Sequence, residues 1–171
     1  MDNKELQGLL KDEKKLNKKI EAYLKNKTLV KQEVNQQELK GHIEKAEHNA
    51  SFVKDALGTG YSDWAVVGCY YSSYHMALAL ISKKGYFSKN HDATLCVLIK
   101  EYINTKLSAE DIEMLNKIYL DNEDVLFYVK SRKEREKASY STQIAFDKKE
   151  VEELRSQTLL FIRKAQEIIK E

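Results

Sequence analysis

The residues best suited to chemistry gather in one basic segment, KSRKEREKASYS, at positions 130–141. Five Lys or Arg side chains stand there against two Glu side chains, which leaves a local net charge of +3. On a helix, spacings of three, four and eight residues place on one broad face the side chains of Arg132, Arg135, Ser139 and Tyr140. Guanidinium forks beside a hydroxyl suit phosphate binding. The segment therefore predicts a phosphate or nucleic-acid site made of Lys130, Arg132, Lys133, Arg135 and Tyr140. The alternative is a solvated helix end with internal Glu–Lys pairs.

Two of the four histidines are candidates for proton transfer. His75 lies in a long uncharged stretch, and the alternative is a core histidine bonded to a tyrosine or a backbone carbonyl. His91 lies at the expected start of a helix, where the alternative is an exposed or capping role. In the functional interpretation both line a cleft where residues 85–91 meet the uncharged stretch, close to Lys83, Lys84 and Lys89.

The remaining polar residues predict neither a metal nor a cofactor. His42 and His48 are six residues apart, which puts them on different faces of a helix. The chain has no glycine-rich phosphate loop, and its two cysteines have no CxxC spacing. Cys69 and Cys96 lie among apolar residues and are expected to be buried, reduced thiols.

Composition places the elements that must position these residues in the all-α class. The chain has no proline and only six glycines in 171 residues, whereas a chain of strands needs turn residues about every 8–12 positions. The net charge of +2 and the isoelectric point near 8.3 are too small to mark the whole chain as a nucleic-acid binder. Any such role must come from local clustering.

Apolar residues at three- and four-residue spacing predict the helices. They cover residues 3–26, 36–57, 62–84 and 91–104, and two further helices begin after Ser108 and Asp147. Residues 1–35 are predicted to be an N-terminal amphipathic helix with a connector that is partly extended. Residues 36–171 are predicted to form an up-and-down bundle of four to five helices, with residues 85–90 as a loop.

The stretch from Trp64 to Ile81 contains no Asp, Glu, Lys or Arg. It approaches the length of a membrane span, but hydrocarbon would tolerate badly the central YYSSYH at 70–75. We therefore predict the most buried helix of the bundle, with His75 hydrogen-bonded inside it. Since the start of the chain has no apolar signal region, we expect a cytoplasmic protein without membrane association.

Four segments in order resemble the HEPN domain over about residues 36–170. They are KAEHNASFVKDAL, WAVVGCYYSSYHMALALISKKGY, KNHDATL, and SRKEREKASYS before a last amphipathic helix. The likeness is greatest to the small stand-alone prokaryotic branch. It implies a homodimer, often encoded beside a minimal nucleotidyltransferase as a toxin–antitoxin-like pair.

Many members of this family are metal-independent ribonucleases, and the resemblance implies where their site would lie. Their signature is Arg, four to six residues, then His, on the helix that matches SRKEREKASYS. Arg would hold the phosphate, and His would move a proton to or from the ribose 2′-hydroxyl. In related pairs a tyrosine just after that histidine is modified by the nucleotidyltransferase, and Tyr140 is loosely comparable to it.

This chain departs from the signature at the histidine. Counting from Arg132, the expected positions hold Lys137, Ala138 and Ser139. Counting from Arg135, they hold Tyr140, Ser141 and Thr142, and no histidine follows His91. Lysine, with an ordinary pKa of about 10.4, is a poor general base near neutral pH. Lys137 is therefore only a weak catalytic candidate.

Three hypotheses follow from the sequence. The first is a non-catalytic HEPN module that binds RNA or a nucleotide through residues 130–140 and is partnered by a nucleotidyltransferase. The second is a metal-independent endoribonuclease that uses a displaced histidine, His75 or His91. The third is a dimerisation or adaptor protein whose basic end is merely solvated. The first is preferred, so an enzymatic activity is not the leading expectation.

Overall fold

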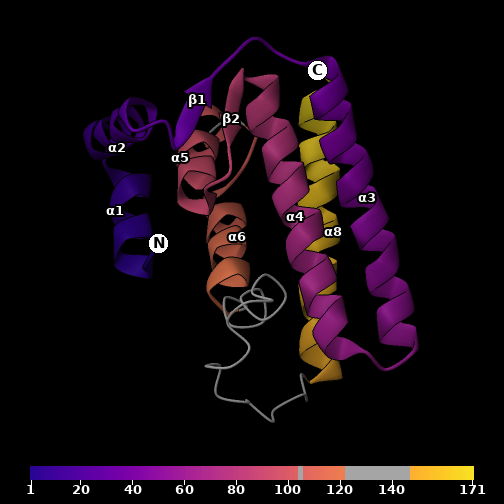
Figure 1. Ribbon diagram of the computed structural model, residues 1–171. Coiled ribbons are helices and arrows are strands. Elements are labelled where there is room, and N and C mark those ends of the chain that lie inside the picture. Colours follow the sequence, from indigo (N-terminus) through magenta and orange to yellow (C-terminus); the bar gives the residue numbers. More distant parts are fainter. Residues whose placement is uncertain (104–105, 122–146) are drawn as a thin grey trace, which may run out of the picture.

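The computed structural model describes residues 1–103, 106–121 and 147–171, and its fold is the expected all-α one (Figure 1). In chain order the elements are α1 (Asn3–Lys11), α2 (Glu13–Lys25), β1 (Leu29–Lys31), α3 (Gln36–Gly58), α4 (Ser62–Lys83), β2 (Tyr86–Ser88), α5 (His91–Tyr102), α6 (Ala109–Asp121) and α8 (Lys148–Lys170). Within these residues, no helix is long and apolar enough to cross a membrane.

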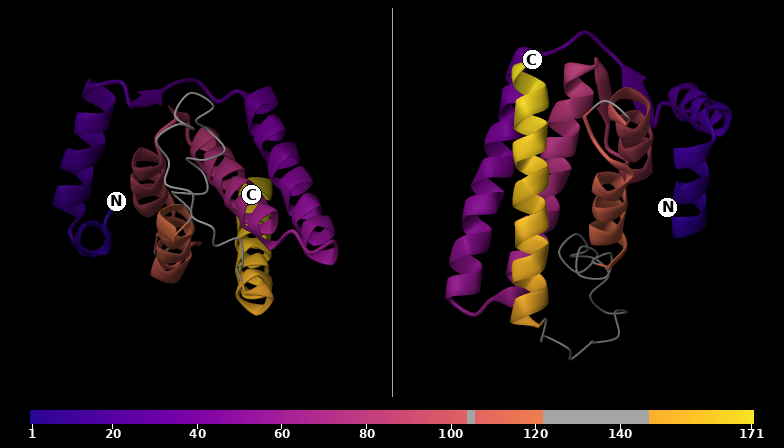
Figure 2. Two further views of the ribbon diagram at one scale, coloured as in Figure 1. Left: turned by 60° about the horizontal axis from the view of Figure 1, so that its bottom comes forward. Right: turned by 180° about the vertical axis from the view of Figure 1, so that it is seen from behind.

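Helix α4 is the central element of the bundle. The long helices α3 and α8 pack along it, and α5 and α6 lie on its other side (Figures 1 and 2). Its side chains are buried along most of its length, from Ala65 to Ser82, which explains why the stretch carries no charge. The expectation of a central buried helix is confirmed, with one correction. Trp64 is 45% exposed because it lies in the first turn of α4, at the end of the bundle.

The N-terminal region is two helices rather than the single helix predicted over 3–26. The chain turns at Asp12, which ends α1 and also caps α2 by accepting a hydrogen bond from the amide of Lys15 at 3.0 Å. Both helices place their apolar seam against α5, and their buried side chains join the main core: Leu6, Leu9, Leu16 and Ile20. This region therefore packs on the bundle.

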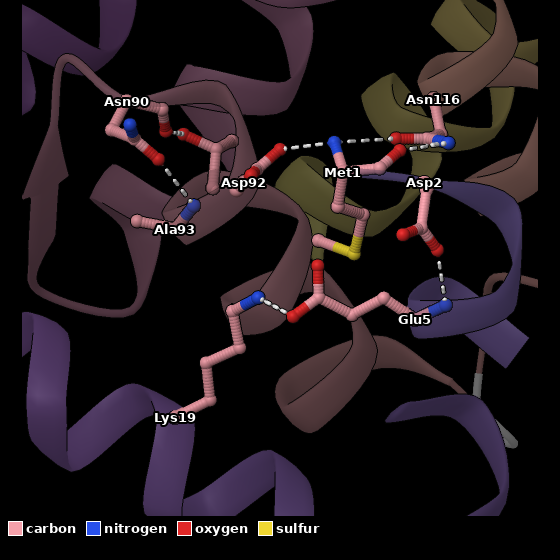
Figure 3. Close-up of polar contacts among 9 residues, drawn as sticks. Met1, Asp2, Glu5, Lys19, Asn90, Asp92, Ala93 and Asn116 are labelled. Carbon is pink, nitrogen blue, oxygen red and sulfur yellow. Dashed lines mark hydrogen bonds and ion pairs between the residues drawn. The ribbon is translucent and has the colours of Figure 1, made fainter. Parts of the chain in front are cut away.

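A buried ion pair fastens the start of the chain to the bundle (Figure 3). The amino group of Met1 donates to Asp92 Oδ1 at 2.7 Å, and the Met1 side chain is fully buried whereas that of Asp92 is partly exposed. Asn116 on α6 donates through Nδ2 to the carbonyl oxygen of Met1 at 3.2 Å. Nearby, Lys19 on α2 pairs with Glu5 on α1. The contact therefore ties α1 to both α5 and α6.

The connector and the predicted loop form a small antiparallel sheet. Leu29 pairs with Ser88 and Lys31 with Tyr86, so the connector is extended, as predicted. Residues 86–88, predicted as part of a loop, are a strand because β1 supplies their backbone partners. Gly85 has φ +73°, and a Cβ there would lie 2.7 Å from the carbonyl oxygen of Gln32. Glycine is therefore required at this turn.

Two predicted helix starts and the state of the thiols are confirmed. The amide of Ser108 donates to Asp111 Oδ2 at 2.9 Å, and the amide of Asp111 returns a bond to Ser108 Oγ at 3.4 Å. Asp147 caps α8. Both cysteines are free and buried. Burial raises the pKa of Cys69 to about 11 and that of Cys96 to about 12, so neither thiol is reactive near neutral pH.

Candidate functional site

One stripe of α4 carries four aromatic side chains: Tyr70, Tyr71, Tyr74 and His75. Spacings of one, four and five residues keep them on one side of the helix. The two serines between them hold α4 in place, since Ser72 Oγ donates to Ala46 O of α3 at 2.6 Å and Ser73 Oγ lies 3.4 Å from Thr158 Oγ1 of α8. Tyr70 is 3% exposed, whereas the other three rings are half-buried. The stripe is thus fixed from behind and open to solvent in part.

His75 is bonded to a second histidine rather than to a tyrosine or a backbone carbonyl. Its Nδ1 lies 3.1 Å from Nδ1 of His42 on α3, and the ring centroids are 5.3 Å apart. One ring must donate and the other accept at this distance, so at most one of the two nitrogens carries the shared proton. The prediction that His75 is hydrogen-bonded inside the bundle is confirmed, although the ring is half-buried rather than fully enclosed.

A carboxylate lies beside this histidine pair. Glu38 Oε1 lies 3.9 Å from Nε2 of His42, one helical turn away on α3. Its other oxygen accepts a hydrogen bond from Gln32 Nε2 at 3.0 Å. A carboxylate at this place favours a proton on Nε2 of His42. Nδ1 of His42 then accepts from Nδ1–H of His75, which leaves the lone pair of His75 on Nε2.

The histidine pair is neutral near pH 7. Burial first, and then the neighbouring His42 and Lys45, lower the pKa of His75 to about 4. Burial also lowers the pKa of His42, against the opposing effect of Glu38. Neutral imidazoles accept protons and hydrogen bonds but do not attract phosphate electrostatically.

His91 completes an aromatic cluster at the junction of α4, α5 and α6. It is the first residue of α5, where Asn90 caps the helix by accepting from the amide of Ala93 at 2.9 Å. Its ring stacks on Tyr119 with 4.2 Å between centroids and 12° between planes. The ring centroid of Tyr74 lies 5.7 Å away. His91 is therefore held by ring contacts rather than exposed at the helix start.

The two histidines proposed from the sequence, His75 and His91, both lie near the ring of Tyr74. Tyr74 lies 6.3 Å from His75 and 5.7 Å from His91, measured between ring centroids. Desolvation raises the pKa of Tyr74, so its hydroxyl stays protonated. We call the following set the aromatic face: His42, Tyr70, Tyr71, Tyr74, His75, His91 and Tyr119. All of these rings except that of Tyr70 are partly open, and partly open rings can stack on nucleic-acid bases.

The other residues proposed from the sequence are not at this face. Lys83 donates to the carbonyl oxygens of Ile168 and Ile169 at 2.6 and 3.0 Å, so it caps the C-terminal end of α8. Lys84 and Lys89 lie over the rings of Tyr102 and Phe87. The basic candidates fall outside the described residues: Lys130, Arg132, Lys133, Arg135, Lys137 and Tyr140.

The sequence did not point to His42. It was considered only with His48 on its own helix, and its contact with His75 depends on how α3 and α4 align. No group of three or more His, Cys, Asp or Glu side chains in the described ranges could hold a metal ion.

Comparison with known proteins identifies the domain. The HEPN domain family profile matches residues 39–169, from within α3 to within α8. A protein of Methanocaldococcus jannaschii named "Putative toxin MJ0142" is 29% identical over 133 residues, which cover 77% of this chain and 82% of that protein. Helices α1 and α2 lie outside the matched residues. Because the family match spans well over half of its length, the chain belongs to the HEPN domain family.

Proposed function

We propose that this protein is a toxin-like HEPN module that binds RNA. The observation that carries the proposal is the aromatic face. Half-buried tyrosine and histidine rings of α4 lie there beside one another and near the rings of His91 on α5 and Tyr119 on α6. Such rings offer stacking surfaces to unpaired bases. The similarity to a protein named as a toxin supports a toxin-like role. The basic segment at 130–140 supplies the charge that phosphate binding needs.

RNA binding can be measured by the fluorescence anisotropy of a labelled single-stranded RNA. Tyr71→Ala should weaken binding by about tenfold, because one stacked base contributes on the order of 1–3 kcal/mol. Tyr71→Phe is the matched control, since it keeps the ring and should bind as the unchanged protein does. Equal affinities for all three proteins would refute the role of the aromatic face.

The phosphate part of the proposal has its own test. Arg132→Lys should weaken RNA binding nearly as much as Arg132→Ala, because only the planar guanidinium grips two phosphate oxygens at once. Affinity should fall steeply with salt, and the slope should become shallower in Arg132→Ala, which removes a positive charge. If neither the affinity nor the salt slope changes, the basic end is merely solvated and the adaptor hypothesis replaces this one.

A second candidate function is metal-independent cleavage of RNA. The observation that favours it is the bonded histidine pair, which presents His75 as a neutral base. In this mechanism His75 takes the proton of a ribose 2′-hydroxyl, and the 2′-oxygen attacks the adjacent phosphorus. The bond from phosphorus to the 5′-oxygen breaks, a 2′,3′-cyclic phosphate forms, and the departing 5′-oxygen takes a proton from water. Cleavage should then persist in EDTA, and it should be lost in His75→Gln at protein concentrations that saturate RNA binding. If the unchanged protein does not cleave RNA, this second function is refuted and only the RNA-binding function stands.

We also propose the assembly that the family resemblance implies. The protein would form a homodimer and act beside a minimal nucleotidyltransferase. Light scattering at micromolar concentration tests the first statement, and a monomer would contradict it. Co-expression with the nucleotidyltransferase of a neighbouring gene tests the second, by co-purification and by the mass change that a transferred nucleotide adds to Tyr140.

A further inference from the structure

A shallow hollow lies at the end of the α3–α4 hairpin, outside the aromatic face. Its volume is about 500 Å³. The C-terminal turns of α3, the connection and the first turn of α4 line it with Phe52, Asp55, Ala56, Thr59, Tyr61 and Trp64. Three of these six side chains are aromatic, and one is a carboxylate.

The hollow is built by the close approach of the two helices. Phe52 and Asp55 of α3 and its C-cap residue Thr59 follow three- and four-residue spacing, so they share one face. Across from them, Gly68 of α4 leaves no room for a side chain. A Cβ there would lie 2.6 Å from Val53 Cγ2 and 3.3 Å from Phe52 Cδ1. The absent side chain lets α4 support the ring of Phe52 from behind.

The three aromatic side chains of the hollow are exposed to solvent. Phe52 is 43% exposed, Tyr61 60% and Trp64 45%. In the described part of the chain, none of them makes a ring contact with another aromatic residue or lies under a cation. A group of exposed aromatic side chains around one hollow is typical of a binding surface.

One charged group of the hollow remains available to a ligand. The hydroxyl of Thr59 donates to the backbone carbonyl oxygens of Asp55 and Ala56, at 2.9 and 3.2 Å. The exposed carboxylate of Asp55, by contrast, has no hydrogen bond or ion pair with any residue that the structure describes. Three ring faces and one free negative charge together favour a cation.

We propose that this hollow binds an arginine side chain presented by a partner polypeptide. Guanidinium is planar, so it can stack on an aromatic ring while its fork meets the two oxygens of a carboxylate. Lysine offers only a point charge, and a neutral apolar side chain would leave Asp55 unpaired. The space exceeds what one guanidinium fills, which leaves room for the neighbouring residues of a peptide. This site is independent of the RNA-binding proposal.

The protein carries its own reporter for the test. Trp64 is the only tryptophan of the 171 residues, so its fluorescence responds to events in the hollow. The probes are three blocked tripeptides, acetyl-Ala-X-Ala-amide, in which X is arginine, lysine or citrulline. Citrulline has the shape of arginine without its charge. The arginine peptide should change the fluorescence saturably, and the citrulline peptide should bind at least about fivefold more weakly. The lysine peptide should fall between them.

Variants of the full chain assign the effect to the hollow. Asp55→Asn should bring the arginine peptide close to the citrulline peptide in affinity, and Phe52→Leu should weaken the arginine peptide by about threefold. Glu21→Gln is the control, because it removes the same charge from an exposed position on α2. Far-UV circular dichroism verifies that each variant is folded.

Several outcomes would overturn the proposal. These are equal affinity for the arginine and citrulline peptides, no effect of Asp55→Asn, an equal effect of Glu21→Gln, or no response to any peptide. A change in Trp64 fluorescence with protein concentration alone would also overturn it, because a second copy of this chain would then cover the hollow.

Discussion

Acidification should narrow the difference in stability between the unchanged protein and the variant His75→Gln. At about pH 7 the variant should be the less stable, because it loses the bond between His75 and His42. At about pH 4.5 the unchanged protein carries an additional penalty that the variant lacks, since glutamine does not titrate. The difference between the two free energies of unfolding should therefore shrink as the pH falls.

The size of this effect follows from the pKa of His75. Burial, His42 and Lys45 together lower that pKa from 6.5 to about 4. The unfolded chain then binds the proton more tightly than the folded one, so this contribution to stability is complete above pH 6.5 and is lost as the pH falls toward 4. The full shift corresponds to roughly 3 kcal/mol at 1.36 kcal/mol per unit. Because the ring is only half-buried, screening by solvent reduces this to about 1.5 kcal/mol.

Urea denaturation followed by far-UV circular dichroism at several pH values measures the effect. The difference between the two free energies of unfolding cancels the contribution of the carboxylates, which titrate in the same pH range in both proteins. His48→Gln is the matched substitution, because it removes an exposed histidine from α3, and its pH series is measured beside that of His75→Gln. A stability difference for His75→Gln that does not change with pH would refute the account of the histidine pair.

Three further substitutions test the packing by chemical denaturation. Leu78→Ala should cost about 2–4 kcal/mol, since the side chain is only 9% exposed in the main core; a loss below about 1 kcal/mol would place it at an edge. Asp92→Ala should cost about 2–3 kcal/mol, because it leaves the buried amino group of Met1 without its carboxylate, and a neutral result would contradict the ion pair. Gly85→Ala should cost more than about 1 kcal/mol, since its Cβ would meet the carbonyl oxygen of Gln32. An unchanged midpoint would show that the turn adjusts freely.

Local signals in the sequence predicted most of the helices. The pair formed by Ser108 and Asp111, the cap at Asp147 and the uncharged stretch of α4 each depend on residues close in the chain. The break at Asp12 was missed because the apolar spacing continues across it. Its signal was present, since an aspartate can both end one helix and cap the next.

Features that depend on distant partners could not be predicted in this way. Residues 86–88 become a strand only because residues 29–31 lie beside them. The contact between His42 and His75 depends on the alignment of two long helices, to within one turn. Periodicity places both histidines on helices but does not say which faces meet. The sequence therefore predicted His75 as a candidate residue but not its partner His42.

The position of α4 has a consequence for the protein while it is being made. Its hairpin partner α3 is synthesised first, but α8, which covers another side of α4, begins only at residue 148. A ribosome adds about 5–20 residues per second. The apolar surface that awaits α8 is thus uncovered on the nascent chain for several seconds, which is long enough for a chaperone to bind it or for neighbouring chains to associate. Slower translation downstream of α4 should then increase aggregation, although the finished fold is unchanged.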